Sequence, residues 1–182
     1  DDGLLDHYKF VLPILKEHDL WGIFFPATGP LQNGRFLDVH RIHLILGRLG
    51  PDKALATLNR LILPHMFLEH DHVNFQNSTY LRQVGDEAAV TFKRILNYLI
   101  SDVYKQDILE NLMLETFGEN GIPSVNNFYM SEDHIKELFS NGMVIGAHSV
   151  NHPILSQCEK ITQEAEIFGS CDYLQSLIGD PI

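Results

Sequence analysis

Two histidines stand four residues apart in the segment His148-Ser149-Val150-Asn151-His152. In a helical turn this spacing places both imidazoles on one face, where they can share a metal ion. The segment directly follows an apolar stretch, and α/β proteins commonly place their sites at the end of a strand. Ser149 can fix the loop by bonding to backbone groups. A histidine pair of this kind also occurs in purely structural roles, so the spacing alone leaves both possibilities open.

A second group with potential chemistry is Asp1-Asp2-Gly3. Two adjacent acids followed by glycine suit a tight turn beside a cation, although Asp-Gly is also common in solvated turns. Combined with the histidine pair, the acids become more informative. Two imidazoles and one carboxylate form a facial ligand set that leaves positions open for water and substrate. The other aspartate can then serve as a base near that water.

The elements that must position these groups begin with a loop, a helix and a strand over residues 1–30. Pro13 suits the first turn of the helix, where its missing N–H costs nothing. The apolar run from 20 to 25 ends at Pro26, as a buried strand would. Residues 27–34 are rich in turn formers and are expected to form a loop.

Residues 36–120 differ from the rest because apolar residues recur at steps of three and four, which is typical of helices. We expect helices over residues 36–49, 52–63, 87–100 and 103–117. No strand is apparent in this block. The pattern predicts a helical insertion between two strands of an α/β core.

The α/β pattern resumes after the insertion. Ser131 is a plausible N-cap for a helix that runs to about residue 140. An apolar strand over 143–147 then leads directly into His148, and a last helix is expected from about Thr162 to Leu177.

These motifs resemble those of the NodB-homology polysaccharide deacetylases, carbohydrate esterase family 4. Asp1-Asp2-Gly3 resembles the end of the family's Thr-Phe-Asp-Asp-Gly motif, and residues 148–152 match its His-(Ser/Thr)-x-x-His motif. The flanking segments over residues 13–25, 142–148 and 179–182 are similar as well. The resemblance covers about residues 1–30 and 122–182, and the helical block lies outside it.

The resemblance implies an α/β fold, part of a distorted (β/α) barrel with a helical insertion at 36–120 inside one partial deacetylase domain. It implies that Asp2, His148 and His152 hold a divalent metal, usually zinc, and that Asp1 is the catalytic base. It also implies the reaction, hydrolysis of N-acetyl groups on an amino-sugar glycan or sugar precursor. The expected partner is therefore a carbohydrate that bears N-acetyl groups.

The family's later motifs supply an oxyanion segment with tyrosine, an aspartate oriented by arginine, and a histidine that acts as general acid. The sequence ends at residue 182 before any of them, so we expect it to be part of a longer protein. Two alternatives stay open. One is a non-catalytic carbohydrate-binding relative. The other is a scaffold whose helical insertion docks a partner through a large exposed apolar patch.

Composition narrows the classes of partner. The chain has 24 acidic and 13 basic residues and a formal net charge of −11. Such a surface repels phosphate backbones and anionic lipids, so neither nucleic acid nor an anionic membrane surface is expected as a partner. No apolar run approaches the ~18 residues of a membrane-spanning helix. His65, His70 and His72 form a further cluster, which is better explained as a polar turn than as a second metal site.

Overall fold

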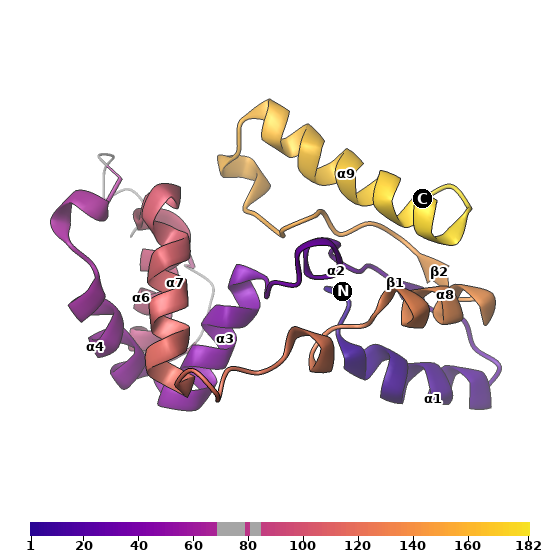
Figure 1. Ribbon diagram of the computed structural model, residues 1–182, viewed down its shortest axis with the longest axis horizontal. Helices are drawn as coiled ribbons and strands as arrows, with labels where there is room; N and C mark the ends of the chain where they lie inside the picture. The colour runs from indigo at the N-terminus through magenta and orange to yellow at the C-terminus, as the bar shows by residue number, and fades with distance from the viewer. Residues whose placement is uncertain (69–78, 81–84) are drawn as a thin grey trace. The chain divides into compact units, whose positions relative to one another are not determined.

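The computed structural model describes residues 1–68, 79–80 and 85–182, and these divide into two compact units (Figure 1). The first unit is made of residues 1–37 and 123–182, and the second of residues 38–122. The sequence had predicted a helical insertion over residues 36–120. Whether both units belong to one deacetylase domain stays a prediction.

The first unit contains a small parallel sheet of β1, Ile23–Phe24, and β2, Val144–Ile145. Each strand pairs with the other at matching positions, Ile23 with Val144 and Phe24 with Ile145. Parallel pairing of strands so far apart in sequence needs a crossover connection, which is the α/β arrangement. Among the described residues this is the whole of the sheet, so the structure shows no barrel.

Both strands are shorter than the apolar runs that predicted them. Phe24 and Ile145 are buried, whereas Ile23 and Val144 are 49% and 46% exposed. The run over residues 20–25 predicts a buried strand, and the run over 143–147 an apolar one. The structure instead gives the period-two alternation of a sheet that is covered on one face.

Helices of the first unit cover the buried face of the sheet. A π-helical turn over His7–Val11 continues into α1, Leu12–Glu17, and Pro13 lies in its first turn as predicted. α8, Glu132–Ser140, packs on β2 and on α9, Lys160–Ile178. Short 3₁₀ turns lie at Val125–Asn127 and Leu155–Gln157. The shared core is formed by Leu12, Phe24, Met130, Ile135, Leu138, Met143, Ile145 and Leu174.

The predicted N-cap of α8 is confirmed. Ser131 Oγ accepts the backbone N–H of His134 at 3.3 Å, and His134 Nδ1 accepts the backbone N–H of Ser131 at 3.1 Å. The exchange is a capping box in which histidine takes the place of the usual acid or amide. α9 begins two residues before the predicted Thr162 and ends at Gly179, whose φ is 74°.

One predicted loop is wrong, because residues 27–34 contain the short helix α2, Gly29–Asn33. Pro30 lies in its first turn, where proline is tolerated. The carbonyl of Thr28 accepts the N–H of Gln32 at 3.0 Å, and Gly34 ends the helix at a φ of 62°. The residues that suggested turns are therefore the start and stop signals of one helical turn.

The described part of the second unit is helical. Its α-helices are α3, Asp38–Leu49, α4, Pro51–Leu61, α6, Glu87–Arg94, and α7, Asp102–Phe117. A π-helical turn over Ile95–Leu99 continues α6, and a 3₁₀ turn lies at Pro64–Met66. The core of this unit is formed by Ile42, Ile45, Ala54, Leu58, Phe92, Ile95, Leu96, Leu99, Ile100, Ile108, Leu109, Leu112 and Met113.

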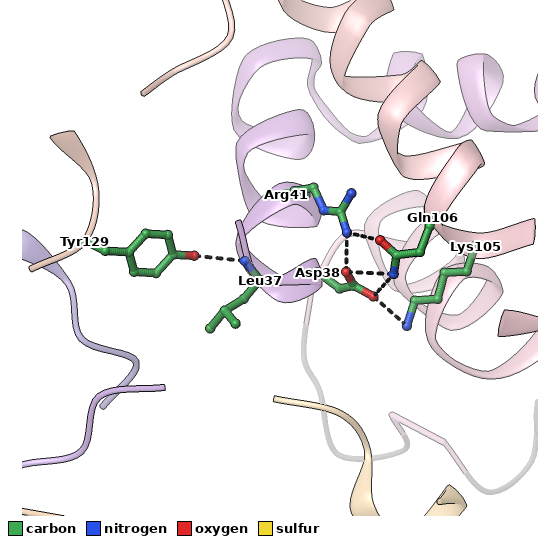
Figure 2. Close-up of polar contacts among 6 residues, drawn as sticks. All are labelled: Leu37, Asp38, Arg41, Lys105, Gln106 and Tyr129. Atoms are coloured by element: carbon green, nitrogen blue, oxygen red, sulfur yellow. Dashed lines mark hydrogen bonds and ion pairs between the residues drawn. The ribbon is translucent and has the colours of Figure 1, made fainter. Parts of the chain in front are cut away.

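A polar network joins the start of α3 to α7 (Figure 2). The Asp38 carboxylate accepts from Arg41 at 2.5 Å and from Lys105 at 3.1 Å, and Gln106 bonds to both Asp38 and Arg41. Burial raises the pKa of Asp38, but the charges of Lys105 and Arg41 outweigh burial and bring that pKa below its ordinary value. Figure 2 also shows, within the first unit, the backbone N–H of Leu37 donating to Tyr129 Oη.

Of the histidine cluster in the second unit, His70 and His72 lie outside the described residues. The His65 ring meets Tyr104 edge to face at a centroid distance of 5.5 Å. In the part of the chain that the structure describes, no helix combines the length and the apolar character needed to cross a membrane.

Candidate metal centre

The candidate site lies where β1 and β2 end. Beyond the strands, the two chain segments stay side by side through backbone hydrogen bonds. Thr28 N–H donates to the Ser149 carbonyl at 3.2 Å, and Gly29 N–H donates to the Val150 carbonyl at 2.7 Å. A Cβ on Gly29 would lie 2.6 Å from the Val150 oxygen, so only glycine permits this approach. The loop of residues 148–152 is thereby fastened to the start of α2.

The Asp1-Asp2-Gly3 turn lies against the residues that follow β1. Asp2 and Gly3 both have left-handed backbone, with φ of 67° and 79°. A Cβ on Gly3 would lie 3.0 Å from the Cβ of Pro26. The Gly3 carbonyl accepts the N–H of Met130 at 2.8 Å, which fixes the turn from its other side. Glycine is therefore required here both by conformation and by space.

The structure brings Asp2, His148 and His152 together. Oδ1 of Asp2 lies 3.2 Å from Nε2 of His148 and 3.6 Å from Nε2 of His152. One ligand atom from each of the three residues falls within 4.8 Å of the other two. The side chains are 23%, 30% and 37% exposed in the same order, so the group is half-buried but open to solvent.

The histidines do not lie on a helix, which corrects the geometry assumed from their spacing. They are the first and last residues of the loop 148–152, in which Ser149 and His152 have left-handed φ of 59° and 56°. The loop is closed by the backbone N–H of His152, which donates to Ser149 Oγ at 3.0 Å. Because of this turn the two rings approach to a centroid distance of 4.9 Å.

Left-handed backbone is concentrated at this site. Among the described residues other than glycine, positive φ occurs at Asp2, Asp19, Tyr80, Ser149 and His152. Two of these five, Asp2 and His152, belong to the ligand group, and a third, Ser149, lies in the loop between the histidines. Such conformations are costly for residues with a Cβ and are typical of functional sites, where the surrounding structure holds them in place.

The electrostatics suit a neutral imidazole at His148. Burial is the main cause that lowers the pKa of His148, the neighbouring His152 lowers it further, and Asp2 acts in the opposite direction. The net pKa lies below the ordinary value of 6.5. At neutral pH the ring is therefore uncharged and has a lone pair to offer to a cation.

The spacing of the Asp2 carboxylate from the two imidazoles suits a tetrahedral ion. With zinc–ligand distances near 2.0–2.1 Å, two ligand atoms of a tetrahedral site lie about 3.3 Å apart. The distances of 3.2 and 3.6 Å from the Asp2 oxygen to the two imidazole nitrogens agree with this spacing. Two imidazoles and one carboxylate leave at least one coordination position open, as catalytic zinc sites do.

Asp1 differs from its neighbour. Its residue is exposed, its backbone carbonyl accepts the N–H of Gly3 at 2.9 Å, and it is not part of the three-residue ligand group. The role of Asp1 as catalytic base, expected from the resemblance, stays a prediction.

The sequence reading missed Glu166, which the structure places beneath the histidine loop. Its carboxylate accepts N–H bonds from the backbone of Val150 and Asn151 and from the Asn151 side chain. The sequence alone gives no signal for these bonds, because two of the three donors are backbone N–H groups. Glu166, Ser170 and Leu174 follow one another at steps of four along α9, and all three are buried. A buried acid on such a stripe needs hydrogen-bond donors, and the histidine loop supplies them.

A pocket of about 270 Å³ adjoins the two histidines. Its other lining residues are Ala147, Ser149, Pro153, Leu155 and Ile167. The walls are therefore mostly apolar, and the polar groups are concentrated at the histidine side. This arrangement suits a small group with an apolar part that must reach the ligand cluster.

Comparison with known families agrees with the resemblance. Residues 106–182 match the family model described as polysaccharide deacetylase, and the recognition drawn from the sequence is confirmed over this stretch. The match includes β2, the histidine loop and α9, whereas Asp1 and Asp2 lie before it. No curated protein and no solved structure matches the chain.

Proposed function

We propose that the protein is a metal-dependent hydrolase that removes N-acetyl groups from an amino-sugar glycan or sugar precursor. The proposal includes the fold that the resemblance implies, in which the parallel pair β1 and β2 is part of a distorted (β/α) barrel. The observation that carries it is the convergence of Asp2, His148 and His152 at distances that suit one divalent cation. The family match supports the substrate class.

In this proposal the ligands are Oδ1 of Asp2 and Nε2 of His148 and His152. Zinc bound there would polarise the amide carbonyl and lower the pKa of water at the site. Asp1 would take the proton from the attacking water, because its carboxylate is adjacent in sequence and is not used as a ligand. Ser149 would hold the loop that presents the histidines, through its bond to the His152 N–H. The products would be acetate and the free amine.

The pocket beside the histidines supports an acetylated substrate. Leu155, Pro153 and Ile167 offer apolar contacts to a methyl group, and His148 and His152 line the same pocket. An acetamide has this division, with an apolar methyl and a polar carbonyl on one carbon.

The test measures zinc content and acetate release from oligomers of N-acetylglucosamine, in the full-length protein and in Asp2→Ala. The wild type should bind one equivalent of zinc and release acetate, and Asp2→Ala should lose both. Asp6→Asn is the matched control, because Asp6 is an exposed acid four residues away. It should behave as the wild type.

Two results would overturn parts of the proposal. A wild-type protein that binds no divalent metal would refute the metal centre. A protein that binds zinc and the oligomer but releases no acetate would be the non-catalytic carbohydrate-binding relative.

A further inference from the structure

Glu166 is a buried acid whose side-chain hydrogen bonds, among the described residues, all go to the histidine loop. The residue is 8% exposed. Oε2 accepts the backbone N–H of Val150 at 2.9 Å and of Asn151 at 2.7 Å, and Oε1 accepts Nδ2–H of Asn151 at 2.8 Å. None of the ion pairs among the described residues involves Glu166.

Burying a carboxylate without a cation is costly unless N–H donors replace water. Here three donors do so, and all three belong to the two residues between Ser149 and His152. Hydrogen bonds to a charged acceptor are about twice as strong as bonds between neutral groups. The carboxylate is therefore a strong anchor for this short segment, and the segment is in turn what satisfies the carboxylate.

The loop is held from two directions. On one side Thr28 and Gly29 donate to the carbonyls of Ser149 and Val150. On the other side Glu166 accepts the N–H groups of Val150 and Asn151. Ser149 closes the turn internally but does not attach it to a neighbouring element. Among the hydrogen bonds of the described residues, only those of Glu166 join the loop to α9, a helix of nineteen residues that packs on α8.

We propose that Glu166 is a positioning residue for the metal centre. By holding the N–H groups of Val150 and Asn151, it maintains the strained turn that presents Nε2 of both histidines to Asp2. The inference rests on the proposed function, because it needs His148 and His152 to be metal ligands. It concerns the loop alone and is independent of the sugar or the chemical step.

The test is a titration of the full-length protein with cobalt(II) alone, followed by its visible absorption. Glu166→Ala should bind cobalt roughly 10- to 100-fold more weakly than the wild type, as is usual when an outer-shell partner is removed. Its cobalt spectrum should also change, because the ligand geometry is loosened. Glu166→Gln keeps an acceptor oxygen for the backbone N–H groups and should recover part of the affinity.

Glu164→Ala is the matched control. Glu164 lies on the same helix, its side chain is 52% exposed, and it pairs with Lys160 at 3.5 Å rather than with the loop. Its cobalt affinity and spectrum should equal those of the wild type. Thermal unfolding of each variant, measured in parallel, shows that the titrated protein is folded.

The outcomes separate the two proposals. If the wild type binds no cobalt, the metal centre itself is refuted. If the wild type binds cobalt and Glu166→Ala binds it equally well, only the role of Glu166 is refuted. If Glu166→Gln is as weak as Glu166→Ala, the acceptor oxygen does not hold the loop and the positioning role is also wrong.

If Glu166→Ala does not fold, Asn151→Ala removes one of the three donors and should weaken cobalt binding several-fold. An unchanged affinity would then overturn the inference.

Discussion

Asp1 and Asp2 are neighbours in sequence but have different surroundings. Asp2 has its carboxylate beside two imidazoles, whereas Asp1 is exposed and outside the ligand group. We expect Asp1→Asn to keep its zinc and lose roughly 10²- to 10⁴-fold in the rate of acetate release, because the amide cannot accept the proton. Elemental analysis and an acetate assay on the same preparation check both parts. A variant that keeps full activity would show that another group is the base.

Adding one methyl group at either of two glycines should change the free energy of unfolding in opposite directions. Gly29→Ala would place a Cβ 2.6 Å from the Val150 oxygen and 2.8 Å from Oδ1 of Asn151. We expect it to cost about 1–3 kcal/mol in the free energy of unfolding, as overpacking does. We also expect it to weaken metal binding, because the histidine loop must shift.

Gly47→Ala is the matched control. Gly47 lies within α3, and a Cβ there would meet nothing within 4 Å. Replacing glycine by alanine in an open helical position should stabilise the protein by about 0.5–1 kcal/mol. Chemical denaturation of both variants measures the difference. Equal effects would mean that the close approach at Gly29 does not constrain the loop.

At the scale of helices, the Asp38 network predicts a dependence of stability on pH. The pKa of Asp38 is lower in the folded protein than its ordinary value of 3.8. The stabilisation that Asp38 provides is therefore complete above about pH 3.8, its ordinary pKa. It is lost as the pH falls through the lower pKa that Asp38 has in the folded protein. Unfolding of the wild type and of Asp38→Asn should converge at low pH and differ by about 1–3 kcal/mol near neutrality. Asp107→Asn, at an exposed position of α7, should show no such convergence.

Two tyrosines hold α8 through its acidic residues. Tyr8 Oη donates to Glu137 at 2.6 Å, and Tyr173 Oη donates to Glu132. Burial, followed by the bond to Glu132, raises the pKa of Tyr173 to about 12. A phenol with a raised pKa stabilises the fold fully below its ordinary pKa of 10, and this contribution is lost as the pH rises towards 12. The pKa values of Tyr8 and Tyr80 are raised as well, so ultraviolet titration should show several late tyrosines, and the component near 12 should disappear in Tyr173→Phe.

The helices were largely predictable because their signals are local. α4 and α7 begin and end within about two residues of the predicted bounds. The Ser131 cap was also predictable, because its partner is three residues away. The strand lengths were not predictable, because they depend on which side chains of each strand face the core. The run at 20–25 is equally apolar on both faces, and only the packing leaves Ile23 exposed.

The same distinction applies to the site. The residue types of Asp2, His148 and His152 were sufficient to suggest a ligand group. Their geometry was not predictable, because it depends on positive φ at Ser149 and His152 rather than on a helix. Glu166 was missed because its partners are backbone N–H groups about sixteen residues earlier, which no pattern of side chains reveals.

At the scale of the whole molecule, each unit has its own hydrophobic core. Leu109 belongs to the core of the second unit and Leu138 to that of the first, and both are fully buried. Truncation to alanine should cost about 2–5 kcal/mol in either case. Only Leu138→Ala should also weaken zinc binding, because its core contains Phe24 and Ile145 of the two site strands. Calorimetry with zinc titration checks this, and equal losses of zinc affinity would contradict it.

The first unit is discontinuous, and this sets an order of events on the ribosome. Residues 38–122 are synthesised before residue 144 exists, so β1 has no partner strand while the second unit is being made. Helical units with local contacts fold within milliseconds, whereas synthesis adds about 5–20 residues per second. The helical unit therefore has seconds in which to fold first. Asp2 meets His148 only after the whole second unit has been synthesised, so the candidate metal centre forms later than that unit.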